Sequence, residues 1–235
     1  MAGSIAALAC AAAPGCKGGG QGGGFSLQSA VRGMFGPSPN ELVAMAFDPN
    51  DADNRRVGIA RLSDRAWGRQ EPYLKGYATI ARTDPNPLVR SVAVRALGRA
   101  GDPNYVGAVA AALDDRETAV RVDAAAALDS LRGPAAVGPL RRRAVADDSE
   151  DVRALCCRAL RHYRRDDVLA TLARCLADKT FTVRWQAHAS LVELTGRDLG
   201  FEAESWADVR ADAASRPAPA SRPWWDLMGV TGKKR

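Results

Sequence analysis

The side chains that most often carry catalysis or bind a metal are scarce in this chain. It holds two histidines, His162 and His188, and five cysteines among 235 residues. Cys156 and Cys157 are neighbours on a predicted helix, where adjacent side chains point in different directions, so they make a poor chelating pair. The sequence contains no glycine-rich phosphate loop after a strand and no Ser-His-Asp arrangement. We therefore name no catalytic residue, no metal ligand and no cofactor, and we favour a non-catalytic protein.

Arginine is the residue type that offers most for binding a partner. The formal net charge is +6, and seven arginines lie on or just beyond two consecutive predicted helices. Guanidinium groups bind phosphate and carboxylate, so this set could bind nucleic acid or an acidic protein. Acidic residues flank the same helices, which favours a solvated face of internal ion pairs over nucleic-acid binding. The candidate binding residues are Arg141, Arg142, Arg143, Arg158, Arg161, Arg164 and Arg165.

A second set of arginines recurs at a nearly constant interval. Val-Arg pairs place these arginines 31, 32 and 31 residues apart, and an aspartate stands six residues before each one. A period near 30 residues with this register indicates a repeat array. One charge at the same place in every unit is expected of a structural ladder and not of a catalytic site. The residues of this predicted ladder are Asp84, Arg90, Asp115, Arg121, Asp147, Arg153, Asp178 and Arg184.

Each unit is predicted to contain two helices. In the unit that begins at Asp84, Asn86 is a good N-cap and Pro87 suits the first helical position. Apolar residues follow at helical spacing, and Gly98 to Gly101 ends the first helix. Asp102-Pro103 begins the second helix by the same capping logic. Because no unit could bury its apolar face alone, stacking of the units has to form the core.

These units resemble the HEAT-repeat family, in particular the short HEAT-like repeats of phycobilin lyases. The resemblance runs from Asp48 to about Gly200 and is carried by phrases such as DPNPLVRSVAVRALGRAGDPNYVGAVAAAL and DVRALCCRAL. It implies an all-α fold, an α-α superhelix (HEAT-like solenoid) of about five helical pairs with terminal capping helices. It also implies that the repeated aspartates and arginines form a hydrogen-bonded ladder along the stack.

Some HEAT-like proteins are enzymes, and one of them has a metal-binding motif that can be compared with this sequence. Deoxyhypusine hydroxylase, a HEAT-like protein, binds two irons through paired His-Glu motifs. Here neither His162 nor His188 is followed by glutamate, so the iron site is not carried over. The cysteines Cys156, Cys157 and Cys175 are interpreted as small apolar residues.

The array is predicted to have a cap at each end. Residues 38–47 form an N-terminal capping helix, because Ser38 and Glu41 have the spacing of a capping box. Residues 48–214 form the array, and its last helix, from about Glu202 to Ala214, is the C-terminal cap. The first unit is degenerate, with Asn54-Arg55-Arg56 in place of Val-Arg.

The N-terminal residues 1–37 are interpreted as a signal-like, glycine-rich flexible leader. Ala13-Pro14-Gly15-Cys16 resembles a bacterial lipoprotein signal, in which the cysteine is lipidated. Ala13 stands where leucine is usual, and no basic residue precedes the apolar run Ile5 to Pro14. The protein is accordingly expected in the bacterial cell envelope if this leader is a signal, and otherwise in the cytoplasm.

Residues 215–235 are interpreted as a proline-rich tether that leads to a tail with two adjacent tryptophans, Trp224 and Trp225. Three interpretations remain open for this pair. The tail folds back onto the end of the stack, docks on a partner, or lies at a membrane surface.

The sequence favours a monomeric, non-catalytic scaffold that binds an unidentified protein, with a lipid on Cys16 as its membrane tether. One alternative is an enzyme or enzyme subunit of the lyase-like or oxidoreductase-like HEAT group. The other is a nucleic-acid binder that uses the arginine-rich face.

Overall fold

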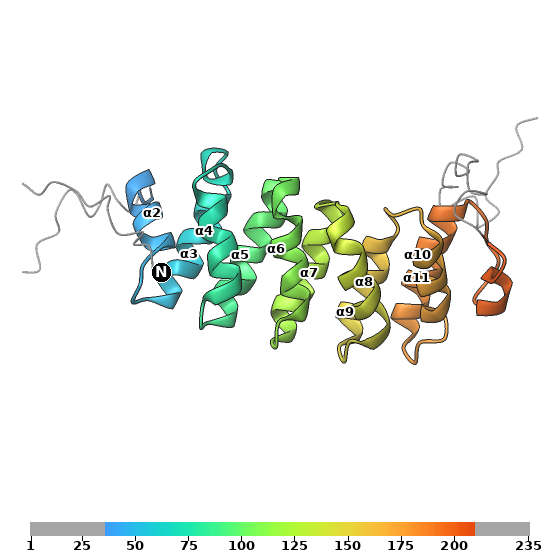
Figure 1. Cartoon of the computed structure of the whole chain (residues 1–235). Helices are drawn as coiled ribbons and strands as arrows, with labels where there is room; N and C mark the ends of the chain where they lie inside the picture. The colour runs from blue at the N-terminus through green and yellow to red at the C-terminus, as the bar shows by residue number, and fades with distance from the viewer. Residues whose placement is uncertain (1–35, 210–235) are drawn as a thin grey trace, which may run out of the picture. The chain divides into compact units, whose positions relative to one another are not determined.

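The computed structural model describes residues 36–209, and the chain divides into two units, Met1–Pro37 and Ser38–Arg235. The described residues of the second unit form ten α-helices and no strand (Figure 1). The α-helices are α2 (Pro39–Ala46), α3 (Ala52–Ser63), α4 (Tyr73–Thr83), α5 (Pro87–Ala100), α6 (Val106–Ala111), α7 (Thr118–Ser130), α8 (Pro134–Ala146), α9 (Glu150–Leu160), α10 (Asp166–Cys175) and α11 (Phe181–Thr195). The 3-10 helices are η1 (Trp67–Arg69), η2 (Pro103–Tyr105), η3 (Ala112–Asp114) and η4 (Ala203–Trp206).

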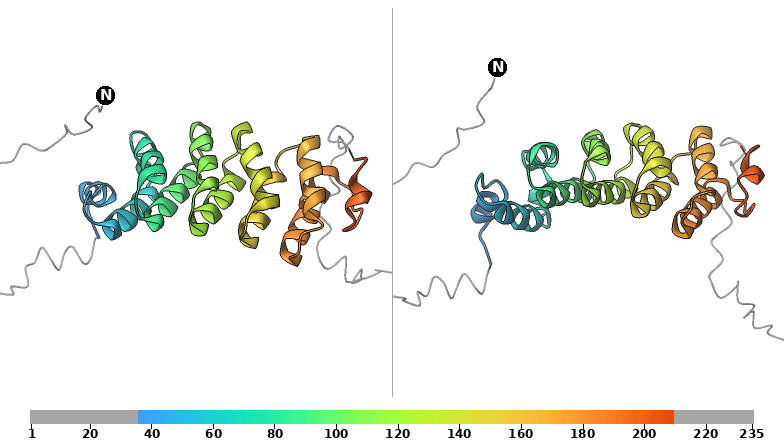
Figure 2. Two further views of the ribbon diagram at one scale, coloured as in Figure 1. Left: turned by 60° about the horizontal axis from the view of Figure 1, so that its bottom comes forward. Right: turned by 90° about the horizontal axis from the view of Figure 1, so that it is seen from below.

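The helices of the second unit pack in two layers, as expected for an α-α superhelix. The first helices of the repeats, α3, α5, α7, α9 and α11, each contact the next one in this order. The second helices α4, α6, α8 and α10 likewise contact one another in order. Figure 2 shows successive helical pairs lying side by side along this unit. The predicted all-α solenoid is confirmed.

Local sequence explains where these helices begin. Ser38 and Glu41 form the predicted capping box of α2, and the Asn86 side chain accepts a hydrogen bond from the backbone N–H of Leu88 at the start of α5. Ser149 and Thr180 occupy the N-cap positions of α9 and α11, but their side chains make no capping hydrogen bond. The structure satisfies their backbone N–H groups in another way, through the repeated aspartates described below.

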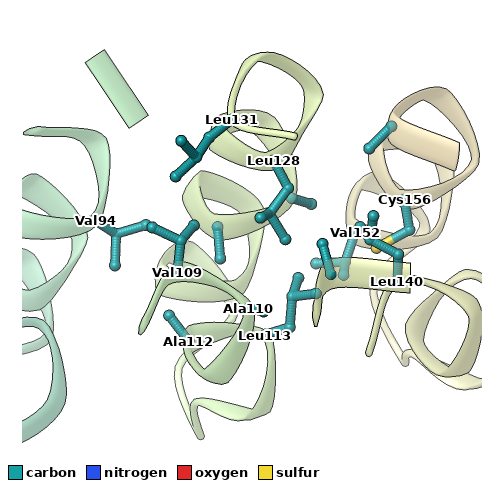
Figure 3. Close-up of a cluster of buried hydrophobic side chains, with 14 of the residues drawn as sticks. Val94, Val109, Ala110, Ala112, Leu113, Leu128, Leu131, Leu140, Val152 and Cys156 are labelled. Carbon is teal, nitrogen blue, oxygen red and sulfur yellow. The ribbon is translucent and has the colours of Figure 1, made fainter. Parts of the chain in front are cut away.

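The core lies between the two layers. Leu128 of α7 and Val152 of α9 come from first helices, whereas Val109 of α6 and Leu140 of α8 come from second helices, and all four are fully buried (Figure 3). One continuous cluster of buried apolar side chains extends from Leu42 in α2 to Val209, after η4. Stacking therefore forms the core that a single repeat lacks.

Small residues let the first helices approach closely. A Cβ atom at Gly98 of α5 would lie 2.6 Å from the Cβ atom of Ala127 in α7. Gly98 therefore lies on the side of α5 that faces α7. The size of these two residues therefore sets the spacing between the second and third repeats.

The C-terminal cap is shorter than we predicted. In the part of the expected helix that the structure describes, up to Val209, the chain forms only η4, from Ala203 to Trp206. Gly196, with a φ of 67°, ends α11, and Gly200, with a φ of 77°, turns the chain towards η4. The expected α-helix from Glu202 is thus wrong for its first residues, and residues 210–214 lie outside the described range.

Candidate functional site

The repeated arginines and aspartates form a ladder, in which Arg90, Arg121 and Arg153 each pair with the aspartate of the following repeat. In the third repeat, Arg121 donates from Nε to Asp147 Oδ2 at 2.8 Å and from Nη2 to Asp147 Oδ1 at 3.0 Å. Its Nη1 donates to the backbone carbonyl of Asp115, its own aspartate, at 3.1 Å. The same pairing joins Arg90 to Asp115 and Arg153 to Asp178, both at 2.7 Å.

The aspartate six residues before Arg121 in the sequence, Asp115, is therefore not its carboxylate partner. Arg121 binds the Asp115 backbone oxygen because the two residues lie one helical turn and one loop apart in the same repeat. The Asp147 carboxylate reaches Arg121 only because α7 and α9 pack side by side. The ladder consequently links repeats to one another, and each repeat contributes one arginine and one aspartate.

Each repeated aspartate also organises the start of its own repeat. The backbone N–H groups two residues further on donate to these carboxylates at 2.9 to 3.0 Å, for example from Ser149 to Asp147 and from Thr180 to Asp178. Burial raises the pKa of Asp178, but hydrogen bonds from Arg153 and Thr180 outweigh burial and lower this pKa to about 2. The aspartate is therefore ionised at neutral pH and supports both the loop and the ladder.

Two ladder residues of the first, degenerate repeat were missed in the sequence. Arg55 donates from Nε to Asp84 Oδ2 at 2.8 Å and from Nη1 to the backbone carbonyl of Asp48 at 2.9 Å. The signal was present, because Arg55 lies seven residues after Asp48, one residue more than in the other repeats. At this end of the ladder the Asp48 carboxylate accepts a hydrogen bond from the Asn54 side chain at 2.9 Å.

The candidate arginines of the third and fourth repeats are largely engaged with carboxylates. Asp129 in α7 lies 3.1 Å from Arg158 Nε and 3.3 Å from Arg161 Nη2. The Arg158 N–H is not aligned for a hydrogen bond, and Nε has no other partner within the described residues. Arg141 and Arg165 pair with Asp167, and Arg142 and Arg143 pair with Asp114. Arg164 also has an interaction partner. These pairs leave fewer guanidinium groups to bind phosphate.

The histidines and helical cysteines do not form a reactive arrangement among residues 36–209. His162 contacts Asp129 at 3.0 Å and His188 contacts Asp198 at 2.8 Å. Burial raises the pKa of the Cys156 thiol, and a hydrogen bond with Cys175 together with burial raises the pKa of Cys157. No group of three or more His, Cys, Asp or Glu in this range could hold a metal ion.

A groove between α4 and α6 was not foreseen from the sequence. Its volume is about 590 Å³. Most of its lining is alanine and glycine, and the exposed side chains of Arg82 and Asp114 bring opposite charges to it. The complete lining is Ala78, Thr79, Ala81, Arg82, Gly107, Ala108, Ala111, Ala112, Asp114 and Asp115. Small side chains at these positions leave room for another chain.

Three candidate residues predicted from the sequence lie outside the described range: Cys16, Trp224 and Trp225. Across residues 36–209, no helix combines the length and the apolar character needed to cross a membrane.

The comparisons with known proteins agree with this geometry. The sequence model of the HEAT-repeat family matches residues 74–154. No curated protein matches the chain. Among solved structures, YibA of Escherichia coli is 22% identical with a TM-score of 0.55 over 70% of this chain. The match covers 59% of YibA, so the chain spans less than two thirds of that relative.

Two further structures have a similar fold. The complex of CpcE and CpcF of phycocyanin lyase from Nostoc sp. PCC7120 is 18% identical, with a TM-score of 0.58 over 78% of this chain and 71% of that chain. A computationally designed armadillo repeat protein for modular peptide recognition is 17% identical, with a TM-score of 0.51 over 77% of this chain and 89% of that chain. At these identities the likeness shows the fold alone.

Proposed function

Because this chain is a HEAT-repeat protein, we propose that it is a non-catalytic scaffold that binds another protein. The observation that carries this proposal is the groove between α4 and α6, which is lined by small residues and flanked by opposite charges. A segment of a partner protein fits such a groove, because alanine and glycine leave its backbone room and Arg82 and Asp114 offer polar contacts. Two proteins of similar fold support it, since one forms a complex and another is designed for peptide recognition.

A pair of matched variants tests the groove. Ala111 lines it and is exposed, whereas Ala170 on α10 is also exposed but lies outside it. We expect Ala111→Trp to fill the groove and Ala170→Trp to leave it open. Proteins captured from the native organism are identified by mass spectrometry, and the dissociation constant of each partner is measured with both variants.

The expected result is a partner that binds wild type and Ala170→Trp with the same affinity and Ala111→Trp at least about tenfold more weakly, a difference of about 1.4 kcal/mol. A partner that binds both variants equally would contradict the groove as its site. Near-integral iron or a bound chromophore in the purified protein would instead favour the enzyme alternative.

We also propose that a lipid on Cys16 attaches this scaffold to a bacterial envelope. The support is the sequence Ala13-Pro14-Gly15-Cys16 and the glycines that follow it. Two acyl chains anchor a protein stably, because each buried methylene contributes about 0.8 kcal/mol. The protein expressed in its native host should incorporate palmitate and fractionate with membranes. Cys16→Ser should abolish both, whereas Cys10→Ser should not, and an unlabelled soluble wild type would contradict the tether.

A further inference from the structure

On α11, the side that faces the C-terminal end of the array carries different residues from the corresponding sides of α5 and α9. The residue directly after the repeated arginine faces the next first helix, as Ser91 of α5 shows by donating a hydrogen bond to Asp123 of α7. Ser91 is 5% exposed and its counterpart Ala154 in α9 is 9% exposed. In α11 this position holds Trp185, which is 54% exposed. A large aromatic side chain thus stands where the other repeats pack against a neighbour.

Trp185 is part of a cluster that we call the C-terminal aromatic patch, formed by Phe181, Trp185 and Phe201. The ring of Trp185 lies 6.1 Å from that of Phe181 and 6.3 Å from that of Phe201. The three side chains are 63%, 54% and 38% exposed for Phe181, Trp185 and Phe201. An exposed cluster of large apolar side chains indicates an interaction surface.

The last arginine of the ladder lies beside this patch and lacks the partner that the others have. Arg184 Nη1 donates to the backbone carbonyl of Asp178 at 2.8 Å, as in the earlier repeats. No carboxylate among the described residues pairs with its Nε and Nη2, which in Arg153 bind an aspartate. Its guanidinium carbon lies 5.8 Å from the centre of the Phe181 ring. The surface therefore combines exposed aromatic rings with a guanidinium group, that of Arg184, whose Nε and Nη2 can bind a carboxylate.

The described cap contacts both layers at this end, since the ring of Trp206 lies 6.3 Å from that of His188 in α11. The 3-10 helix η4 packs on α10, and Trp206 within it is buried and donates a hydrogen bond to the backbone carbonyl of Gly200 at 2.9 Å. Val209, the last described residue, is 9% exposed. The chain therefore leaves the described structure at the same end of the array as the C-terminal aromatic patch.

We propose that the segment Trp224–Met228 of this same chain docks on the C-terminal aromatic patch, with its tryptophan rings on the patch and the Asp226 carboxylate on Nε and Nη2 of Arg184. Trp-Trp-Asp-Leu-Met contains groups that complement both parts of the surface, apolar rings for the aromatic patch and one carboxylate for Arg184. Asp226 takes the place that the aspartate of a next repeat would occupy.

Chain length favours this segment over a second copy of the protein. Residues 210–223 join Val209 to Trp224, and 14 extended residues reach about 46 Å. Neighbouring packed helices are only about 10 Å apart, so this connection is long enough to pass from α10 to α11. A covalent connection also gives the segment an effective concentration in the millimolar range. Docking would complete the end of the array, as terminal caps do in repeat proteins.

Fluorine NMR of the full chain labelled with 5-fluorotryptophan tests this proposal. The chain has five tryptophans, and single Trp224→Phe and Trp225→Phe variants assign the two tail resonances. We expect both resonances to lie away from their positions in the urea-unfolded chain and to have a reduced solvent isotope shift. Trp185→Ala, which removes an exposed ring, should return both to the unfolded positions while circular dichroism stays unchanged.

A matched pair of charge variants tests the ladder contact. Asp226→Asn should lower the docking equilibrium constant by about tenfold, since a charge-assisted hydrogen bond is lost. Asp208→Asn, an exposed residue next to η4, should leave it unchanged. Tail resonances at the unfolded positions in wild type would overturn the proposal. Protection that increases with protein concentration, together with a doubled mass in sedimentation, would overturn it in favour of a second copy.

Discussion

The repeated arginine has the same local sequence in the middle of the array and at its C-terminal end, but different surroundings. In the middle, the Arg121 side chain is 9% exposed and faces the fully buried carboxylate of Asp147. At the end, Arg184 keeps the bonds to its own repeat and has no carboxylate partner among residues 36–209. The contacts within a repeat are therefore set locally, whereas the ion pair requires a following repeat.

This difference decides how much each arginine contributes to stability. Removing one partner of a buried ion pair leaves a charge that water cannot solvate, whereas an exposed pair loses little. The same contrast separates Arg121 from Arg142, whose side chain is 62% exposed beside Asp114. Burial of the ion pair, and not residue type, determines the effect.

The largest effect is expected for Arg121→Ala. The variant leaves the buried Asp147 carboxylate with only Arg143 at 3.3 Å and the backbone N–H of Ser149 at 3.0 Å. We expect a loss of about 3 kcal/mol in the free energy of unfolding. Urea denaturation measures it, with Arg142→Ala as a control that changes the free energy by about 0.5 kcal/mol or less. Equal midpoints for Arg121→Ala and wild type would contradict a stabilising ladder.

A smaller loss is expected where two repeats are closest. The added methyl group of Gly98→Ala would lie 2.6 Å from the Cβ atom and 3.1 Å from the Cα atom of Ala127, so α5 and α7 must move apart. We expect a loss of about 2 kcal/mol, measured by thermal unfolding. Gly107→Ala in α6 is the control, because its added methyl group meets open space and should stabilise the helix by about 1 kcal/mol. Similar effects of the two variants would show that the close approach is unimportant.

Lowering the pH should reduce the stability that the ladder provides, because its aspartates become protonated. The folded pKa of Asp178 is about 2, below the ordinary value of 3.8, so its stabilising contribution is complete above the ordinary value. This contribution is lost as pH falls from about 4 to about 2, and it is at most about 2 kcal/mol. Urea denaturation across this range should show a smaller loss for Arg153→Gln, which lacks the charged partner. Parallel pH profiles of the two proteins would exclude Arg153 as the cause.

The smallest effect is expected for Arg184→Ala at the end of the array. This variant removes bonds to the backbone carbonyls of Asp178 and Lys179 but leaves no buried aspartate without a partner in the described structure. We expect a loss of about 1 kcal/mol in the free energy of unfolding. A loss as large as that of Arg121→Ala would remove the distinction between the middle and the end.

Much of the fold could be predicted because helix signals are local. The Ser38 capping box and the Asn86 cap depend on residues within one helical turn, and both are present. The first residues of the expected last helix, 202–209, were predicted wrongly, because a polar stretch after Gly200 provides helical spacing but forms only the short turn around Trp206. Arg55 was missed because the extra residue after Asp48 hid its register.

The candidate surfaces were harder to predict, because they join residues from different repeats. The groove needs α4 and α6 side by side, and neither helix has a sequence motif that marks it. The exposure of Trp185 follows from its place in the last repeat, since the corresponding Ala154 is buried.

By itself, the sequence determined a stack of helical pairs with one arginine and one aspartate in each, because period, caps and apolar spacing are read along the chain. Only the tertiary structure decided that Arg121 binds Asp147 and not the carboxylate of Asp115, and that Arg184 is left with no carboxylate in the described part of the chain. The physical reason is that an ion pair between repeats depends on which helix packs alongside, and burial by that helix determines its strength.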